Sequence, residues 1–272
     1  NPHCSLATFY YLCGNQKRIV LPPSPMSDRH RNLTDFLFVD IATVPQYPCL
    51  LDAPEQYQQL WQRKAEGLRR APDDPIADYG RAALYAEFGK IVAVAAGYFW
   101  QDGGDTLLRI SAFAGDEKRV LSAVLVAMSK YGHKNPGFRL CTYNGREFDC
   151  PFMARRLIIH SMPLPEVLDV AGARPWEIHQ LDVMDLWRFG DRREYTPLDL
   201  LAYTLGITLP EGKLDGSQIA EAYYTRGELW DIARYCQHNA LATAQVLRRY
   251  RNLAPLPPGQ IGLVDPKIYE AK

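Results

Sequence analysis

The stretch FLFVDIATVPQYP, residues 36–48, decides how the rest of the chain is interpreted. It opens with an apolar run, residues 36–42, which is interrupted near its end by Asp40, as in a buried strand. Two positions later stands Ala42. Alternate residues of a strand face the same side, so an acid at this position would lie beside Asp40. The stretch predicts a strand that carries one acid and, at the matching position, only a methyl group.

The composition is that of an ordinary globular protein. The chain has 272 residues, of which 47% are hydrophobic, and its 31 basic residues balance its 31 acidic ones. A neutral molecule must meet a polyanion through a local patch or a bound cation. No apolar run reaches the length of a membrane span, so we expect no membrane partner. The six cysteines form no CxxC pair, which argues against zinc and a disulfide framework and favours a reducing, cytoplasmic location.

Hydrophobic periodicity and breaker residues place the elements along the chain. The expected strands are 36–42, 90–100, 106–113, 138–144 and 179–186. The expected helices are 54–69, 116–131, 148–161, 197–205, 216–225 and 228–250. The sequence QDGGD, residues 101–105, predicts a hairpin loop between the second and third strands. This order predicts an α/β protein with a mixed five-stranded sheet and helices on both faces.

The sequence also predicts how the chain is divided. Residues 1–25 fit poorly with the rest, and we expect an extension of unknown origin that is loosely attached. No linker interrupts the middle of the chain, so residues 26–255 are expected to form one domain. Residues 256–272 are expected to form a Pro-rich, extended tail.

Polar side chains at the ends of these elements suggest one shared site. Asp40 lies near the end of the first strand, and Asp149 lies where a helix starts after the fourth. Tyr235 and Asn239 are four residues apart, on one face of the last helix. Each residue alone has an ordinary structural explanation as a cap, a dipole partner or a packing residue. Together they are typical of phosphoryl chemistry, in which carboxylates hold Mg²⁺ or Mn²⁺ ions about 4 Å apart.

Four segments carry a resemblance to a known family: VDIATVP, CTYNGREFDCPFMARRL, LDVMDLWRF, and LDGSQIAEAYYTRGELWDIARYCQHNALATAQVLRRY. Together they resemble the bacterial predicted 3′–5′ exonucleases related to the proofreading domain of family-B DNA polymerases. These enzymes belong to the tyrosine-containing branch of the DEDD group, and they have a ribonuclease-H-like fold. The resemblance runs from about Phe36 to Tyr250 and keeps the order of the motifs.

The first two motifs of the family differ in how well this chain matches them. The first motif reads Asp-x-Glu-Thr-Val-Pro, so Asp40 matches and Ala42 replaces the glutamate. The second motif reads Asn-Gly-x-x-Phe-Asp, and Asn144, Phe148 and Asp149 match it.

The third motif of the family reads Tyr-x-x-x-Asp, with a threonine four residues later. Tyr235 and Thr243 match this motif, whereas Asn239 stands in place of the aspartate. A related, histidine-containing motif would instead place Thr243 at the acid, but the register from Tyr235 fits the surrounding residues better.

The resemblance therefore implies a site that lacks two of its four carboxylates. In the family the glutamate bridges a metal and holds the attacking water, which the tyrosine orients. Ala42 cannot bind a metal, and Asn239 offers only a neutral oxygen to supplement Asp40 and Asp149. We expect weakened binding of Mg²⁺ or Mn²⁺ and a chain that is inactive or strongly impaired. Such replacements occur both in natural homologues and in variants made to trap a substrate, and the sequence does not distinguish the two.

The expected substrate is the end of a single-stranded DNA, with RNA as an alternative. Asn144 and Arg146 lie on the loop of the second motif, and Tyr143 and Phe148 are candidates for stacking on terminal bases. A second interpretation is a non-catalytic nucleic-acid-binding module that kept the groove and lost the metals. A third is a structural or partner-binding use of the same fold.

Overall fold

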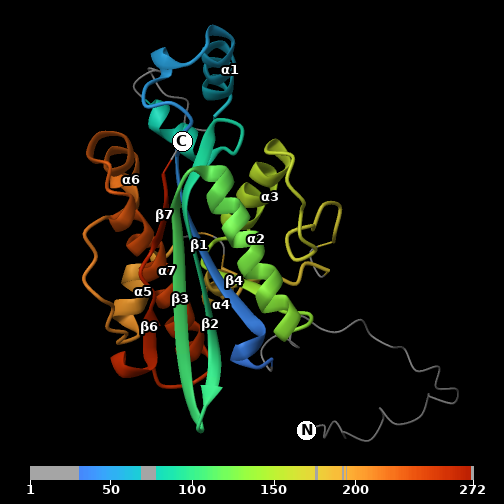
Figure 1. Cartoon of the computed structure of the whole chain (residues 1–272), viewed down its shortest axis with the longest axis vertical. Helices are drawn as coiled ribbons and strands as arrows, with labels where there is room; N and C mark the ends of the chain where they lie inside the picture. The colour runs from blue at the N-terminus through green and yellow to red at the C-terminus, as the bar shows by residue number, and fades with distance from the viewer. Residues whose placement is uncertain (1–30, 69–77, 175–176, 192, 194, 271–272) are drawn as a thin grey trace, which may run out of the picture.

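A computed structural model describes residues 31–68, 78–174, 177–191, 193 and 195–270, and Figure 1 shows the chain. Within these residues the centre is a mixed sheet of seven strands with helices on both faces. The strands are β1 (Phe36–Pro45), β2 (Gly89–Asp102), β3 (Asp105–Gly115), β4 (Arg139–Thr142), β5 (Leu181–Asp182), β6 (Ile261–Leu263) and β7 (Lys267–Tyr269). The helices are α1 (Glu55–Glu66), α2 (Glu117–Lys134), α3 (Asp149–Ile159), α4 (Val183–Arg188), α5 (Leu198–Thr204), α6 (Ile219–Glu221) and α7 (Leu229–Tyr250). The predicted α/β class is confirmed, whereas the predicted extension, residues 1–25, lies outside the described residues.

The strand order is β5-β4-β1-β2-β3-β6, and β7 also pairs with β3. Strands β1, β2 and β3 are antiparallel neighbours, and β4 and β5 run parallel to β1. The β2–β3 hairpin turns at Gly103 and Gly104, which both have positive φ, as a two-residue turn requires. Strand β4 pairs with only the first part of β1, Phe36–Phe38, so the later residues of β1 have one free edge.

The alternation of side chains along β1 divides the core between two faces. Phe36, Phe38 and Ala42 pack in the cluster that includes the buried side of α7. Leu37 and Val39 pack in the cluster that includes the buried sides of α2 and α3. Every second residue of a strand points the same way, so Asp40 shares the face of Phe38 and Ala42 and lies towards α7.

The predicted fifth strand, residues 179–186, is mostly wrong. Strand β5 contains only Leu181 and Asp182, and α4 begins at the next residue. The Asp182 carboxylate accepts a hydrogen bond from the backbone N–H of Met184 (3.0 Å) and so caps the start of this helix. Because the apolar residues here fit a short strand and a short helix equally well, periodicity alone could not identify the cap.

Two other elements differ from the sequence prediction. The expected tail contains β6 and β7, whose strands run parallel to β3 and raise the predicted five strands to seven. Such short segments carry little local signal, and the free edge of β3 supplies their hydrogen-bond partners. The expected helix over 216–225 is divided into a 3₁₀ turn (Gly216–Gln218), α6, and a π-helical turn (Ala222–Arg226).

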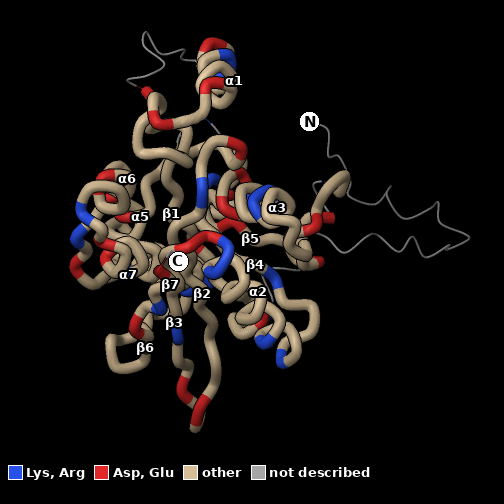
Figure 2. Tube along the Cα trace, turned by 45° about the horizontal axis from the view of Figure 1, so that its top comes forward, with Lys and Arg blue, Asp and Glu red and all other residues tan. Residues whose placement is uncertain are grey.

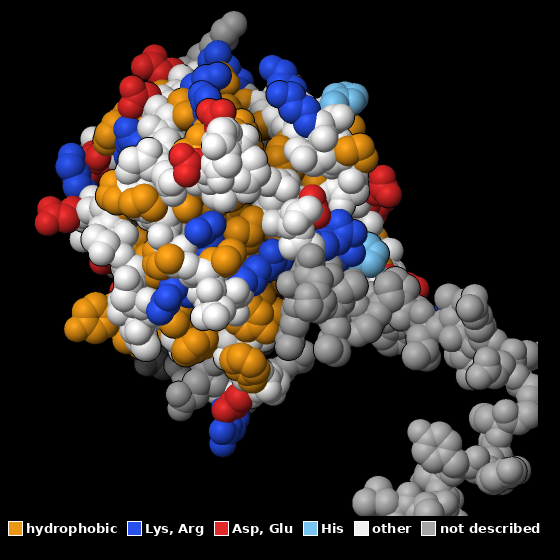
Figure 3. All heavy atoms as spheres, turned by 90° about the horizontal axis from the view of Figure 1, so that it is seen from below, with side chains coloured by type: hydrophobic (Ala, Val, Ile, Leu, Met, Phe, Trp, Pro, Cys, Tyr) orange, Lys and Arg blue, Asp and Glu red, His pale blue; other side chains and the backbone are white. Residues whose placement is uncertain are grey.

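Charged residues of both signs are interspersed over the molecule. Lys and Arg alternate with Asp and Glu along much of the trace, and acids mark the tip of the β2–β3 hairpin (Figure 2). Viewed from below, Lys and Arg side chains lie among hydrophobic ones in the middle of the face (Figure 3). Among the described helices, none has the length and apolar character needed to cross a bilayer.

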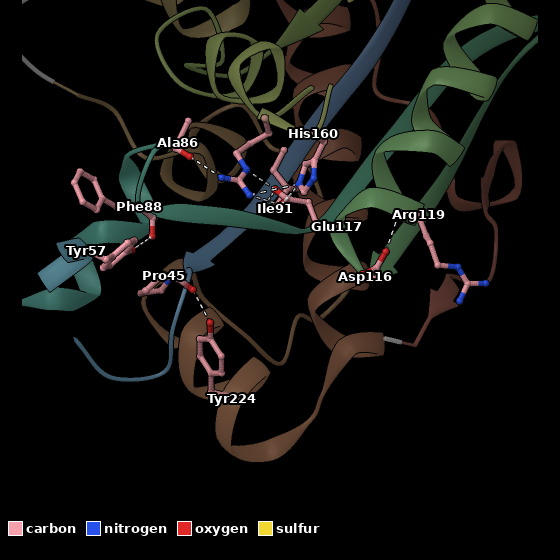
Figure 4. Close-up of polar contacts among 11 residues, drawn as sticks. Pro45, Tyr57, Ala86, Phe88, Ile91, Asp116, Glu117, Arg119, His160 and Tyr224 are labelled. Carbon is pink, nitrogen blue, oxygen red and sulfur yellow. Dashed lines mark hydrogen bonds and ion pairs between the residues drawn. The ribbon is translucent and has the colours of Figure 1, made fainter. Parts of the chain in front are cut away.

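A buried ionic cluster joins α2, α3 and β2 (Figure 4). The Glu117 carboxylate, on α2, receives hydrogen bonds from Arg156 Nε (2.8 Å) and Nη2 (2.5 Å) and from the backbone N–H of Ile91 (2.7 Å). His160 Nε2 lies 2.6 Å from the same carboxylate. Arg156 also donates to the carbonyl of Ala86 (2.8 Å). The Glu117 cluster therefore links α2 and α3 to strand β2 of the sheet.

Candidate active site

A pocket of about 460 Å³ opens beside β1 and α7. Its walls come from β1, the loop after β4, the start of α3, the segment before α5, the loop before Gly216, and α7. Seven residues that the sequence analysis singled out line it together: Asp40, Tyr143, Asn144, Phe148, Asp149, Tyr235 and Asn239. These residues come from segments up to about 200 positions apart along the chain, and the fold brings them to one place.

Asp40 is contributed by the central strand of the sheet. The Nδ2 amide of Asn239, on α7, donates a hydrogen bond to Asp40 Oδ2 (3.4 Å). Burial raises the pKa of Asp40 well above its usual value, and the charge of Asp149 raises it further. Hydrogen bonds from the Cys236 thiol and the Asn239 amide oppose this shift. The charged form of Asp40 is therefore disfavoured unless a cation is nearby.

Asp149 is the first residue of α3 and is 5% exposed. Its Oδ1 accepts a hydrogen bond from the backbone N–H of Ile41 (3.0 Å). This N–H is available because β4 is too short to pair with this part of β1. Burial raises the pKa of Asp149 to about 7, against the opposing effect of the Ile41 hydrogen bond. The bond fixes the second carboxylate against the strand that carries the first.

Ala42 lies on the same face of β1 as Asp40, but it does not line the pocket. The residue is 3% exposed and packs in the core beneath α7. A glutamate at this position would start from a buried backbone two residues from Asp40. Its carboxylate would therefore add a third negative charge close to the other two.

Tyr235 and Asn239 project from one face of α7 into the pocket, as their spacing predicted. Burial and the charge of Asp40 raise the pKa of Tyr235, and a hydrogen bond with the Asn239 side chain acts against this shift. The loop across the pocket passes close by, since a Cβ added to Gly216 would lie 3.1 Å from the Tyr235 hydroxyl. Because its pKa is raised, Tyr235 remains a protonated hydrogen-bond donor at neutral pH.

The turn after β4 is held by Asp182. Its two carboxylate oxygens accept hydrogen bonds from the backbone N–H groups of Asn144 (2.8 Å) and Arg146 (3.1 Å). Asn144 adopts the left-handed conformation (φ 61°), and a side chain on Gly145 would clash with Thr142, with contacts of 2.5–2.8 Å. The Asn-Gly pair therefore shapes the turn that leads into Asp149.

The residues predicted to contact nucleic acid take different positions. Tyr143 and Phe148 line the pocket, and the Tyr143 hydroxyl donates to the carbonyl of Thr196 (2.5 Å). The Arg146 guanidinium pairs with Asp185 (3.3 Å) and is not part of the pocket wall. Its contact with a substrate stays a prediction.

Two pocket residues were missed from the sequence. Tyr195 lines the pocket and is 58% exposed. Partial burial raises its pKa, and the charges of Asp199, Asp149 and Asp40 raise it further. His238 is half-buried on α7, where burial and Arg234 lower its pKa and keep it neutral. Tyr195 lies outside the motif positions, whereas His238 is the histidine of the alternative, histidine-containing motif. The place of each in the pocket depends on the tertiary structure.

The donor set of the pocket suits a hard cation poorly. Among the described residues, no three His, Cys, Asp or Glu side chains are grouped closely enough to hold a metal. The donors at the motif positions are the Asp40 and Asp149 carboxylates and the Asn239 amide oxygen, and the Asp199 and Asp215 carboxylates also line the wall. All are oxygen donors, the ligand type that Mg²⁺ and Mn²⁺ prefer. The motif positions supply two carboxylates and one neutral oxygen, a set that does not match a pair of ions held by four carboxylates.

Residues 82–255, well over half of the chain, match the family described as predicted 3′–5′ exonucleases related to the exonuclease domain of PolB. The chain belongs to this family. The match includes the turn after β4, Asp149 and all of α7, and the seven-stranded model is consistent with the ribonuclease-H-like fold of such exonucleases. Strand β1 precedes the matched range, and the contacts of Asp40 and Ile41 connect it to the matched residues. No curated protein matches this chain.

Proposed function

We propose that this chain is a 3′–5′ exonuclease scaffold for single-stranded nucleic-acid ends, and that its own cleavage is strongly impaired. The supporting observation is the convergence of Asp40 and Asp149, from β1 and α3, with Asn239 donating a hydrogen bond to Asp40. In this bond the neutral amide of Asn239 donates to Asp40, and Asn239 stands at the position where the family has an acid. DNA is the proposed substrate, with RNA as the alternative.

The residues of the pocket suggest how an end is held. Exonuclease domains generally use divalent metals, which offset the charge that develops on the phosphate and activate a water molecule. In this chain Asp40 and Asp149, with the oxygen of Asn239, would hold such an ion, Mg²⁺ or Mn²⁺. Tyr235 presents a protonated hydroxyl to orient water, and the rings of Tyr143 and Phe148 offer surfaces for a terminal base. Ala42 supplies no ligand, so the set for a second ion is incomplete.

A non-catalytic binding module is the second candidate. The Asn239–Asp40 hydrogen bond also favours this function, because it stabilises the pocket without a cation. The four free cysteines of the described residues agree with the predicted cytoplasmic location, which stays a proposal.

The test compares four chains: the present one, Ala42→Glu, Asn239→Asp, and the double variant. Each digests an oligonucleotide labelled at either end, with Mn²⁺ or with chelator. We expect negligible digestion by the present chain and little by the single variants. The double variant should digest from the 3′ end at least a hundredfold faster, because the carboxylates act as one metal-binding unit.

The matched control carries the same charge changes at exposed positions, Ala171→Glu with Asn252→Asp. It should stay as inactive as the present chain. Adding Asp149→Asn to the repaired double variant should remove the recovered activity. Strong, chelator-sensitive digestion by the unmodified chain would contradict the assignment of the metal ligands, and a repaired chain that binds but does not cleave would favour the binding module.

A further inference from the structure

The active-site pocket has no positive charge to hold a nucleic-acid strand. Its wall contains Asp40, Asp149, Asp199 and Asp215, and no Lys or Arg among the described residues. Such a wall offers phosphate groups no cation to pair with, and the whole molecule has no net positive charge to attract them. A strand that places its end in the pocket must therefore be held elsewhere.

A second hollow, of about 620 Å³, has the complementary chemistry. We name it the α4–α7 groove, and its wall includes Trp187, Phe189, Arg249, Tyr250 and Arg251. No acidic side chain of the described residues lines it. It lies towards the C-terminal end of α7. Arg251, the residue that follows this helix, stacks over the ring of Phe36 at the start of β1.

Phe189 presents its ring in an unusual way. It is 75% exposed and has a left-handed backbone (φ 47°), which is rare for a bulky residue. Its ring lies 6.1 Å from that of Tyr250, at an angle of 36°. The left-handed backbone has a structural role, because Phe189 is the C-cap that ends α4. That role does not require an aromatic ring that is three-quarters exposed. The two rings offer stacking surfaces that any base can use.

The groove and the pocket lie along one face of α7. Tyr235, Asn239 and Ala242 line the pocket, and Val246 and Arg249 line the groove. These positions follow each other at intervals of three and four residues, so both hollows lie on one side of the helix. Ala242 and Val246 are each 1% exposed, so a strand would pass over the segments that cover them. From Asn239 to Tyr250 the helix rises about 16 Å, a distance that a few nucleotides span.

We propose that the α4–α7 groove binds the single strand behind the end that occupies the active-site pocket. Phe189 and Tyr250 stack on its bases, and Arg249 meets its phosphates. Basic residues in the last turn of a helix also stabilise the helix dipole, but that role does not account for the exposed ring of Phe189. The inference rests on the proposed function, because it assumes that the pocket receives a strand end.

The experiment measures fluorescence anisotropy of labelled oligothymidylates of three and of twelve nucleotides, with chelator present. The whole chain should bind the longer strand more tightly. Phe189→Ala should weaken binding of the longer strand about five- to a hundredfold, with little change for the shorter one. Phe189→Tyr should restore it, and Arg249→Ala should lower the salt dependence by about one phosphate contact.

Tyr203→Ala is the matched control, because this tyrosine on α5 is 83% exposed and lines neither hollow. It should bind both strands as the unmodified chain does. Equal affinity of the unmodified chain for both lengths, or full binding of the longer strand by Phe189→Ala, would overturn the groove and leave the proposed function intact. A Phe189→Ala change that alters the molecular mass in light scattering, and not the affinity, would instead identify a self-association surface. Failure of the unmodified chain to bind either strand would contradict the proposed function itself.

Discussion

Two carboxylate sites share helix α3 and are built in opposite ways. Near the C-terminal end of α3, Arg156 makes two hydrogen bonds to buried Glu117, and His160 and Ile91 complete the cluster (Figure 4). At the N-terminal end, Asp149 lies beside Asp40, with no cationic side chain lining their pocket among the described residues. The Glu117 cluster is neutralised within the protein. The Asp40–Asp149 pair lacks a cationic side chain in its pocket among the described residues, so a bound cation would be needed to neutralise it.

The difference separates a carboxylate that serves the fold from a pair that is a candidate for function. A buried charge that serves the fold is paired and fully hydrogen-bonded, since an unpaired one is costly. The raised pKa values of Asp40 and Asp149 indicate that ionising these carboxylates costs free energy in the folded chain. A bound cation would relieve that cost. Three measurements test this contrast.

The largest effect is expected when the Glu117 cluster loses its arginine. Arg156→Ala leaves the Glu117 carboxylate buried and without its main partner, which should lower the free energy of unfolding by about 3–5 kcal/mol. Arg155→Ala, at the neighbouring exposed position, should change it by less than about 0.5 kcal/mol. Urea unfolding of both variants is the measurement. Equal midpoints would show that the Glu117 cluster contributes no stability.

A smaller effect, of opposite kind, is expected at Asp149. Its pKa of about 7 exceeds that of the unfolded chain, so between pH 4 and 7 the folded state holds a proton that the unfolded state releases. This contribution to stability is present at low pH and is lost as the pH rises through 7. Asp149→Asn keeps the acceptor for the Ile41 N–H and should remove a fall of roughly 2–4 kcal/mol between pH 5 and 8.

The measurement is the urea unfolding free energy of both chains across this pH range. Asp169→Asn, an exposed change of the same chemistry, serves as the control and should keep the slope of the unmodified chain. An unchanged slope in Asp149→Asn would show that the carboxyl titrates as it does in the unfolded chain.

The smallest effect is expected from a metal ion. Mn²⁺ in roughly tenfold excess over its dissociation constant should raise the stability by about 1–2 kcal/mol. The gain should appear above pH 7 and fade below it, because the ion competes with protons for Asp40 and Asp149. Thermal melts with and without Mn²⁺ measure it, and Asp149→Asn should show no gain. Two tight sites in a calorimetric titration would contradict the incomplete donor set.

Patterns in the sequence predicted most of the elements and the candidates for the site. Apolar runs and helical spacing located β1 to β4, α2 and α7. Buried apolar side chains form short runs in buried strands and recur every three or four residues in helices, so burial leaves a pattern in the sequence. The ordered motifs indicated Asp40, Asp149, Tyr235 and Asn239, and the fold places all four in one pocket. The motifs also indicate positions 42 and 239, where the resemblance implies acids and this chain has Ala and Asn; the loss of activity expected from these replacements stays a prediction.

The contacts that these residues make could not be predicted from local patterns and became visible in the folded chain. A capping bond from Asp182 converted a predicted strand into α4, and the free edge of β3 recruited β6 and β7. The Glu117 cluster, Tyr195 in the pocket and Phe189 in the groove depend on contacts between segments far apart in the chain. Local periodicity records which side chains are buried. It does not record which partner they meet, because that depends on how distant segments pack and which polar groups remain to be satisfied.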